Sequence, residues 1–211
     1  MPRTGRACRP PGRRRPKGGW RVGQARDPAP TVPPLLAEGL DVVFVGYNPG
    51  RHSARTGHHF AGPGNYFWVL LHEAGFTGAL LRPEQDGELL WWGIGIANLV
   101  ERVTASAADL APAELRAGAA RLRGTLGRLA PRAVCFLGKE LYRYWAGWPA
   151  SVPVAWGPAA APRLPGVLEF VAPNPSRRST VPYSVRLAWF VRLRGMLPDG
   201  GRRGTPPAGL V

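Results

Sequence analysis

Residues 41–50 read DVVFVGYNPG, in which an apolar, β-branched run stops at Gly46 and passes into an Asn-Pro-Gly turn. Such a run is typical of a strand that is buried on both faces, as the strands of parallel sheets are. We therefore predict a strand at Asp41–Val45. The same pattern recurs along the chain and predicts three further strands, within Ile94–Val100, at Ala133–Leu137 and at Val167–Ala172.

Segments with helical periodicity separate these predicted strands. The longest, Pro112–Leu129, repeats apolar residues at spacings of three and four and carries Arg on its other face, as an amphipathic helix does. Strands that alternate with helices indicate a layered α/β domain with a largely parallel central sheet. The other helices are predicted at Asn65–Glu73, with Asn65 as the N-cap, at Glu140–Trp145 and at Pro182–Leu197.

Three loops of unusual composition follow predicted strands. They are Gly46–Pro63, Asn98–Thr104 and Pro173–Thr180. Ligands of open α/β sheets bind in the crevice beyond the carboxyl ends of the strands, so these loops are where we expect the chemistry.

The two ends of the chain differ from its middle. Residues 1–26 hold nine basic residues, eight Arg and Lys17, and no acidic residue. Such a stretch buries too little apolar surface to offset the entropy cost of ordering it. We therefore predict a disordered basic arm over residues 1–30, a folded domain over 36–197 and a flexible tail over 198–211.

The formal net charge of +15, from 28 basic and 13 acidic residues, indicates a polyanionic partner, of which nucleic acid is the commonest. For the arm alone, a genome that favours Arg, Gly, Pro and Ala codons is an alternative explanation.

Cysteine content limits the chemistry further. The chain has two cysteines, Cys8 in the arm and Cys135 in an apolar run, too few for a disulfide framework, a four-thiolate zinc site or an iron–sulfur cluster. We expect no metal and no cofactor. No apolar run approaches the length of a membrane span, and the N-terminus lacks the apolar stretch of a secretory signal. These features favour a cytoplasmic, nucleoid-associated protein of a bacterium.

The loops carry four motifs of a known family. They are GYNPG at 46–50, GHHFAGPGNYFW at 57–68, NLVERVT at 98–104 and NPS at 174–176. In this order and spacing, the chain resembles the mismatch-specific uracil/thymine DNA glycosylases of the uracil-DNA glycosylase superfamily from about Asp41 to Leu193. The resemblance implies a three-layer α/β/α sandwich with a short, mainly parallel sheet.

The same resemblance implies a monofunctional glycosylase that acts as a monomer on double-stranded DNA. It would flip uracil and related damaged pyrimidines from a G·U mismatch and hydrolyse the N-glycosidic bond, which initiates base excision repair.

Two residues match catalytic positions of the family. Asn48 matches the asparagine that places a water beneath C1′ of the flipped nucleotide. An amide does not take a proton near neutrality, so it can orient the water but cannot act as a general base, and catalysis must rest on positioning and leaving-group stabilisation. His59 matches a histidine beside the departing base, where it either stabilises the leaving anion or is a structural histidine.

Five further residues match positions that contact the base. Phe60 matches the aromatic platform, and Asn98 can offer the N3 and O4 edge of uracil a complementary acceptor and donor. Ser53 matches the position beside carbon 5, where a hydroxyl disfavours thymine. Gly50 belongs to the first motif. Tyr47 replaces an aliphatic residue and either stacks on the base or narrows the pocket.

The third loop matches the segment that penetrates the duplex. It comprises Asn174, Pro175, Ser176, Arg177, Arg178 and Ser179. Arg178 is the predicted wedge, whereas Arg177 is expected to bind phosphate. Bacterial relatives often have Gly-Leu where this chain has Arg177-Arg178, which affects the backbone reading of the opposing guanine.

Two other functions remain open from the sequence. One is a uracil glycosylase that acts on any uracil-containing DNA, although such enzymes usually carry Asp or Glu in the first motif or a four-cysteine cluster. The other is a non-catalytic nucleic-acid-binding protein on the same fold, for which the basic arm would serve equally well.

Overall fold

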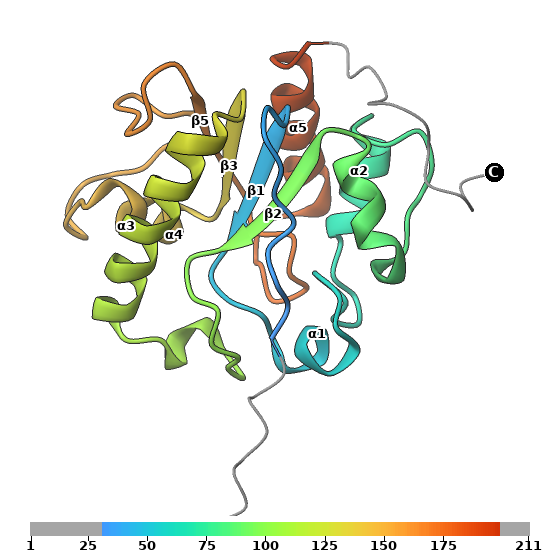
Figure 1. Cartoon of the computed structure of the whole chain (residues 1–211), viewed down its shortest axis with the longest axis horizontal. Helices are drawn as coiled ribbons and strands as arrows, with labels where there is room; N and C mark the ends of the chain where they lie inside the picture. The colour runs from blue at the N-terminus through green and yellow to red at the C-terminus, as the bar shows by residue number, and fades with distance from the viewer. Residues whose placement is uncertain (1–30, 199–211) are drawn as a thin grey trace, which may run out of the picture.

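The four apolar runs form four parallel strands of one sheet in the computed structural model, which describes residues 31–198 (Figure 1). A short fifth strand pairs antiparallel at one edge, and the order across the sheet is β2-β1-β3-β5-β4. The strands are β1 (Val42–Gly46), β2 (Ile94–Asn98), β3 (Ala133–Leu137), β4 (Gly157–Pro158) and β5 (Leu168–Ala172). The predicted basic arm and nearly all of the predicted tail lie outside the described residues.

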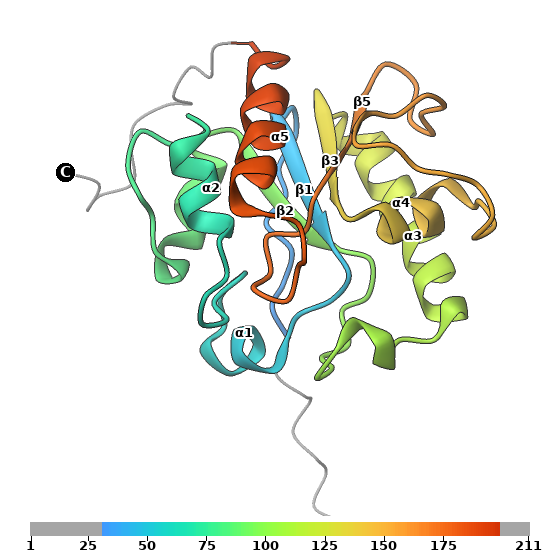
Figure 2. The same cartoon turned by 180° about the vertical axis from the view of Figure 1, so that it is seen from behind.

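Helices cover both faces of this sheet (Figures 1 and 2). The helices are α1 (Arg51–Thr56), α2 (Phe67–Glu73), α3 (Pro112–Leu129), α4 (Lys139–Ala146) and α5 (Tyr183–Gly195), with short 3₁₀ helices η1 (Pro83–Leu90) and η2 (Ala107–Asp109). The predicted α/β/α sandwich with a mainly parallel sheet is confirmed.

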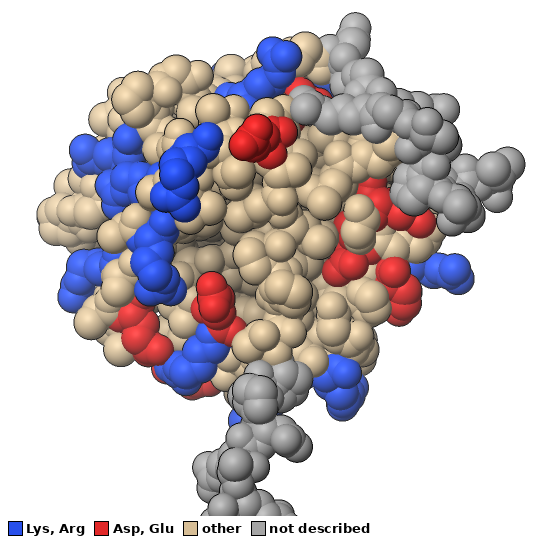
Figure 3. Space-filling view, in the orientation of Figure 1, with Lys and Arg blue, Asp and Glu red and all other residues tan. Residues whose placement is uncertain are grey.

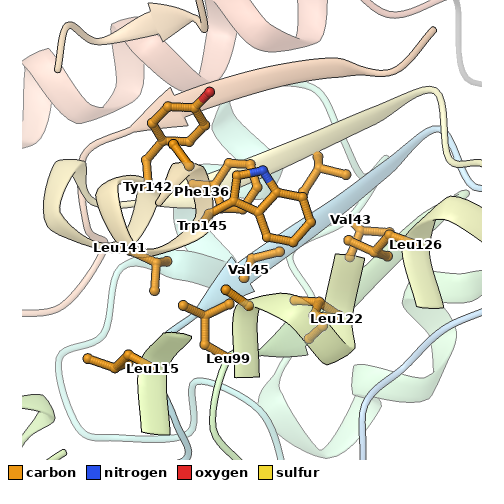
Figure 4. Close-up of a cluster of buried hydrophobic side chains, with 14 of the residues drawn as sticks. Val43, Val45, Leu99, Leu115, Leu122, Leu126, Phe136, Leu141, Tyr142 and Trp145 are labelled. Atoms are coloured by element: carbon orange, nitrogen blue, oxygen red, sulfur yellow. The ribbon is translucent and has the colours of Figure 1, made fainter. Parts of the chain in front are cut away.

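Alternate residues of each strand supply two separate cores, because successive side chains of a strand point to opposite faces. Val43 and Val45 pack with Phe136 against α3 and α4, a cluster that includes Leu122 and Trp145 (Figure 4). On the other face, β1 contributes Val42 and Phe44, which pack against α2 and α5. The two cores hold the strands rigidly, so the loops at the carboxyl ends of the strands rise from fixed positions.

Several local details differ from the sequence predictions. Helix α2 begins at Phe67, two residues after the predicted start, because the Asn65 side chain turns the chain by accepting a hydrogen bond from the Phe67 N–H at 3.0 Å. Helix α1 lies inside Gly46–Pro63, which we predicted to be a loop. The prediction missed this helix because its six residues show no apolar periodicity. Strand β4 was not predicted, because two residues of Gly-Pro carry no strand signal.

Residues before 36, the predicted start of the folded domain, already pack against the fold. Val32 is buried and Leu35 pairs with Ile96 in an antiparallel bridge along the outer edge of β2. Cys135 is fully buried, and burial raises the pKa of its thiol well above the ordinary value. Among residues 31–198, no helix is long and apolar enough to cross a membrane.

A candidate active site at the carboxyl ends of the strands

A cavity of about 840 Å³ opens where the parallel strands end. Loops that follow β1, β2 and β5 line it together with Leu137, the last residue of β3. Eleven of the thirteen predicted site residues are among the lining residues, which brings together segments that are more than a hundred residues apart in the sequence. These eleven are Tyr47, Asn48, Gly50, Ser53, His59, Phe60, Asn98, Asn174, Ser176, Arg178 and Ser179.

The amide of Asn48 is held in one orientation. Its Nδ2 donates hydrogen bonds to the backbone carbonyl of Arg102 and to the hydroxyl oxygen of Thr104, both at 2.8 Å. A carbonyl can only accept, so the opposite flip of the amide would bring two acceptors together. Nδ2 must therefore face Arg102, and the carbonyl oxygen Oδ1 is left as the acceptor available to a ligand or a water in the cavity.

Thr104 is a positioning residue that sequence reasoning did not single out. Its hydroxyl donates to the carbonyl of Ser106 at 2.6 Å, so its oxygen can only accept from Asn48. Thr104 also forms a parallel bridge with Gly50, which ties the second loop to the first. The residue lies within the quoted NLVERVT motif, but only the fold shows that its hydroxyl meets Asn48.

An exposed ion pair braces the same loop. The Arg102 guanidinium donates two hydrogen bonds of 2.9 Å to the Glu114 carboxylate at the start of α3. The hydrogen bond from Arg102 lowers the pKa of Glu114 to about 2, so the pair stays charged at neutral pH. The carbonyl that orients Asn48 belongs to this same Arg102.

Phe60 and Asn98 meet above the end of β1. Phe60 has a positive φ of 51°, which is unusual for a residue with a side chain, and its ring stacks on Phe67 with centroids 4.0 Å apart. Asn98 stands beside Gly46 in the parallel register, and a Cβ at residue 46 would lie only 2.7 Å from its Oδ1. Gly46 therefore has to be glycine for the Asn98 side chain to fold over it. Within the described residues, no hydrogen bond occupies the Asn98 amide.

Ser53, in α1, and Tyr47, directly after β1, also line the cavity. The buried Ser53 hydroxyl accepts a hydrogen bond from the Ala61 N–H at 3.2 Å, which joins α1 to the turn that carries Phe60. Tyr47 also packs against the core beneath α4, and burial is the main cause that raises the pKa of its phenol to about 12. Its ring is therefore an uncharged, largely apolar wall.

His59 is 3% exposed and its ring is anchored to the N-terminal segment. Nε2 lies 2.9 Å from the carbonyl of Pro33, which can only accept, so Nε2 carries a proton. Burial is the main cause that lowers the pKa of His59, so Nδ1 is unprotonated in the neutral ring. This arrangement supports the structural alternative for His59, whereas its predicted action on a leaving base stays a prediction.

The third loop closes the cavity opposite the first. Asn174 donates from Nδ2 to the carbonyl of Leu137 at 3.3 Å, and its Oδ1 accepts from the Ser176 N–H at 2.8 Å. Arg178 is exposed and borders the cavity, as a wedge would require. Pro175 and Arg177 do not line it. The stem of Arg177 lies across Gly64, where a Cβ would come within 2.9 Å of the Arg177 Cδ.

This arrangement suits a flat, polar ring with a reacting atom near Asn48. The lining offers the aromatic ring of Phe60, the Asn98 amide and the acceptor oxygen Oδ1 of Asn48 to such a ring. Within residues 31–198, no group of three His, Cys, Asp or Glu side chains gathers as metal ligands would.

In a comparison with protein families, one family model matches nearly all of the described domain. The model described as the uracil DNA glycosylase superfamily matches residues 33–194, which include every strand, all five helices but the last residue of α5, and the complete cavity lining apart from Val32.

Proposed function

Because this chain belongs to the uracil DNA glycosylase superfamily, whose members are hydrolases that act on DNA, we propose that it is a mismatch-specific member. It would remove uracil and related damaged pyrimidines from G·U duplexes and leave an abasic site. The observation that carries this proposal is the fixed amide of Asn48, which presents a carbonyl oxygen rather than a carboxylate to the cavity.

The proposed reaction begins with extrusion of the nucleotide into the cavity. Unstacking costs a few kcal/mol, about 1–3 of which an aromatic platform such as Phe60 returns. The Asn98 amide would accept from N3–H and donate to O4 of the base. A water held by Asn48 Oδ1 attacks C1′ as the bond to N1 breaks, the electron pair leaves with the base, and the water loses its proton to solvent.

The absence of a carboxylate at residue 48 predicts a preference among bases. Asn48 cannot take the proton from the water, so the bond must break largely under the pull of the leaving base. Bases that form stable anions, uracil above all, are then the best substrates. The cavity would also align the water with C1′ and exclude part of the solvent, and both effects lower the activation barrier further.

The test is single-turnover cleavage of a G·U duplex by the wild type and by Asn48→Ala, in EDTA, with duplex binding measured in parallel. We expect the variant to bind the duplex normally and to cleave it about 10²-fold more slowly or worse, because it loses the amide oxygen that would hold the water but none of the residues proposed to contact the base or the phosphates. A Thr104→Ser variant is the matched control, since it keeps the hydroxyl that orients Asn48 and should retain most activity.

Three other outcomes would change the proposal. Equal rates on single-stranded and A·U substrates would point to a glycosylase for any uracil in DNA. Wild-type binding without cleavage on uracil, thymine and etheno-cytosine substrates would point to a non-catalytic DNA-binding protein. Unchanged cleavage by Asn48→Ala would remove Asn48 from the mechanism.

A further inference from the structure

A buried arginine holds the third loop from behind. Arg186 lies in the first turn of α5, and only 5% of its surface is exposed. Arg186 is not among the residues that line the cavity, and none of the sequence motifs contains it. Burial of a charged side chain is costly unless hydrogen bonds compensate it, so the partners of Arg186 indicate its role.

Those partners are backbone carbonyls of one loop. Nε donates to Val181 at 2.7 Å, Nη1 to Ser176 at 3.1 Å and Pro175 at 3.4 Å, and Nη2 to Ser179 at 3.3 Å. None of these four partners is a carboxylate. The planar fork of a guanidinium can reach several fixed acceptors at once, whereas the compact ammonium of lysine cannot. The contacts therefore fold the loop around one side chain.

The same side chain links this loop to the loop that carries Phe60. The Arg186 guanidinium lies 5.1 Å from the centre of the Tyr66 ring, a cation–π contact. Tyr66 also donates its backbone N–H to the carbonyl of Pro175 at 3.0 Å. Arg186 thus fixes the third loop relative to the stacking platform as well as relative to α5.

We propose that Arg186 is a positioning residue for base extrusion. By holding the carbonyls of residues 175–181 inward, it keeps Arg178 and the loop backbone in the shape that enters the duplex. This inference rests on the proposed function. Arg186 touches neither the base nor the water, so its loss should impair extrusion from a duplex and leave the bond-breaking step intact once a base is in the cavity.

The first experiment needs no substrate. Trypsin cleaves after Arg177 and Arg178, and cleavage requires the loop to open. We expect Arg186→Gln to be cut there about tenfold faster or more than the wild type, because local opening becomes more frequent. Arg192→Gln is the matched control: it removes the same charge from an exposed part of α5, where Arg192 lies 5.2 Å from the Trp189 ring, and should be cut at the wild-type rate.

The second experiment compares substrates. Under single-turnover conditions, Arg186→Gln should lose about 10²-fold on a G·U duplex and about threefold or less on single-stranded uracil, as expected for a positioning defect. Arg186→Lys should fall between wild type and Arg186→Gln in both assays. Thermal unfolding of each variant identifies any variant that has lost its fold. If Arg186→Gln does not fold, the proposal is tested by whether Arg186→Lys shows the partial loss in both assays.

Two results would overturn the proposal: wild-type resistance of the loop to trypsin in a folded variant, or equal losses on duplex and single-stranded substrates. A protein that cleaves no uracil would contradict the proposed function instead, and the tryptic rate would still decide whether Arg186 shapes the loop.

Discussion

Ser53 shows how one side chain can serve both the fold and the selection of a base. Its hydroxyl oxygen accepts from the Ala61 N–H and so supports the turn before Phe60, yet Ser53 also lines the cavity. At the position predicted to lie beside carbon 5 of the base, this hydroxyl would face hydrogen in uracil and a methyl group in thymine. A polar group pressed against a methyl group loses hydration without gaining a hydrogen bond.

Ser53→Ala should therefore raise thymine cleavage relative to uracil cleavage, by about tenfold if the hydroxyl costs roughly 1.4 kcal/mol against the methyl group. The check is the ratio of single-turnover rates on G·T and G·U duplexes. Ser151→Ala, at an exposed serine outside the cavity, serves as the control. An unchanged ratio would show that Ser53 does not select the base.

His59 makes stability depend on pH. Its pKa lies below the ordinary 6.5 in the folded protein, mainly through burial, and returns to that value on unfolding. The unfolded chain then binds more protons at mildly acidic pH, so the free energy of unfolding falls as pH drops below 6.5. We expect His59→Gln to show a weaker fall in urea unfolding measured between pH 8 and pH 5. A variant curve parallel to the wild type would contradict this assignment.

At the scale of elements, the site is assembled from loops that the sheet brings together. β1 and β2 are neighbours, so Gly46 and Asn98 end side by side, and β5 delivers Asn174 close enough to bond the end of β3 at Leu137. The third loop is held by the Arg186 guanidinium, which binds three of its carbonyls, and by the Tyr66 N–H, which donates to a fourth at Pro175. Its tip presents Arg178 to the cavity.

Arg178→Ala should lower activity on paired uracil more than on single-stranded uracil, by about tenfold or more. Extrusion of a paired base leaves a gap in the duplex that the wedge would fill, whereas a single strand has no such gap. Single-turnover rates on the two substrates measure this difference. Arg177→Ala is the comparison: as a phosphate contact, Arg177 should affect both substrates to a similar degree. Equal losses in Arg178→Ala would refute the wedge role.

At the scale of the molecule, the distribution of basic side chains and the position where the described chain begins both favour DNA as the partner. Basic side chains gather on the side where α3 and α4 lie (Figure 3), and α3 exposes Arg116, Arg121 and Arg128 there. The described chain begins beside the cavity, because Val32 lines it and the carbonyl of Pro33 binds His59. The nine basic residues of segment 1–26 are thus attached at the edge where DNA is proposed to bind.

Deleting residues 1–26 should weaken duplex binding and flatten its salt dependence, since log K falls by about 0.9 per phosphate neutralised. Single-turnover cleavage should persist, because every residue proposed to act on the base or the water lies outside this segment. The measurement is binding affinity over a series of salt concentrations. Deleting residues 199–211, which removes two Arg and one Asp, is the control and should change the slope far less. An unchanged slope without residues 1–26 would show that the arm does not neutralise phosphates.

The sequence alone determined the four parallel strands, the long helices and the α/β layering, because apolar runs and helical periodicity are local properties of the chain. Strand β3 and helix α3 were predicted with the bounds that the structure gives. The motifs also predicted which loops line the cavity. Helix α1 and strand β4 escaped prediction, since neither carries enough local apolar pattern.

Only the tertiary structure decided how the site residues are held. The hydrogen bonds from Asn48 to Arg102 and Thr104 span more than fifty positions, and those of His59 and Arg186 end on backbone carbonyls. A carbonyl is present at every residue, so no sequence pattern marks the one that will accept a given hydrogen bond. Its partner is set by the register of the strands and the packing of the loops, and these depend on the whole fold.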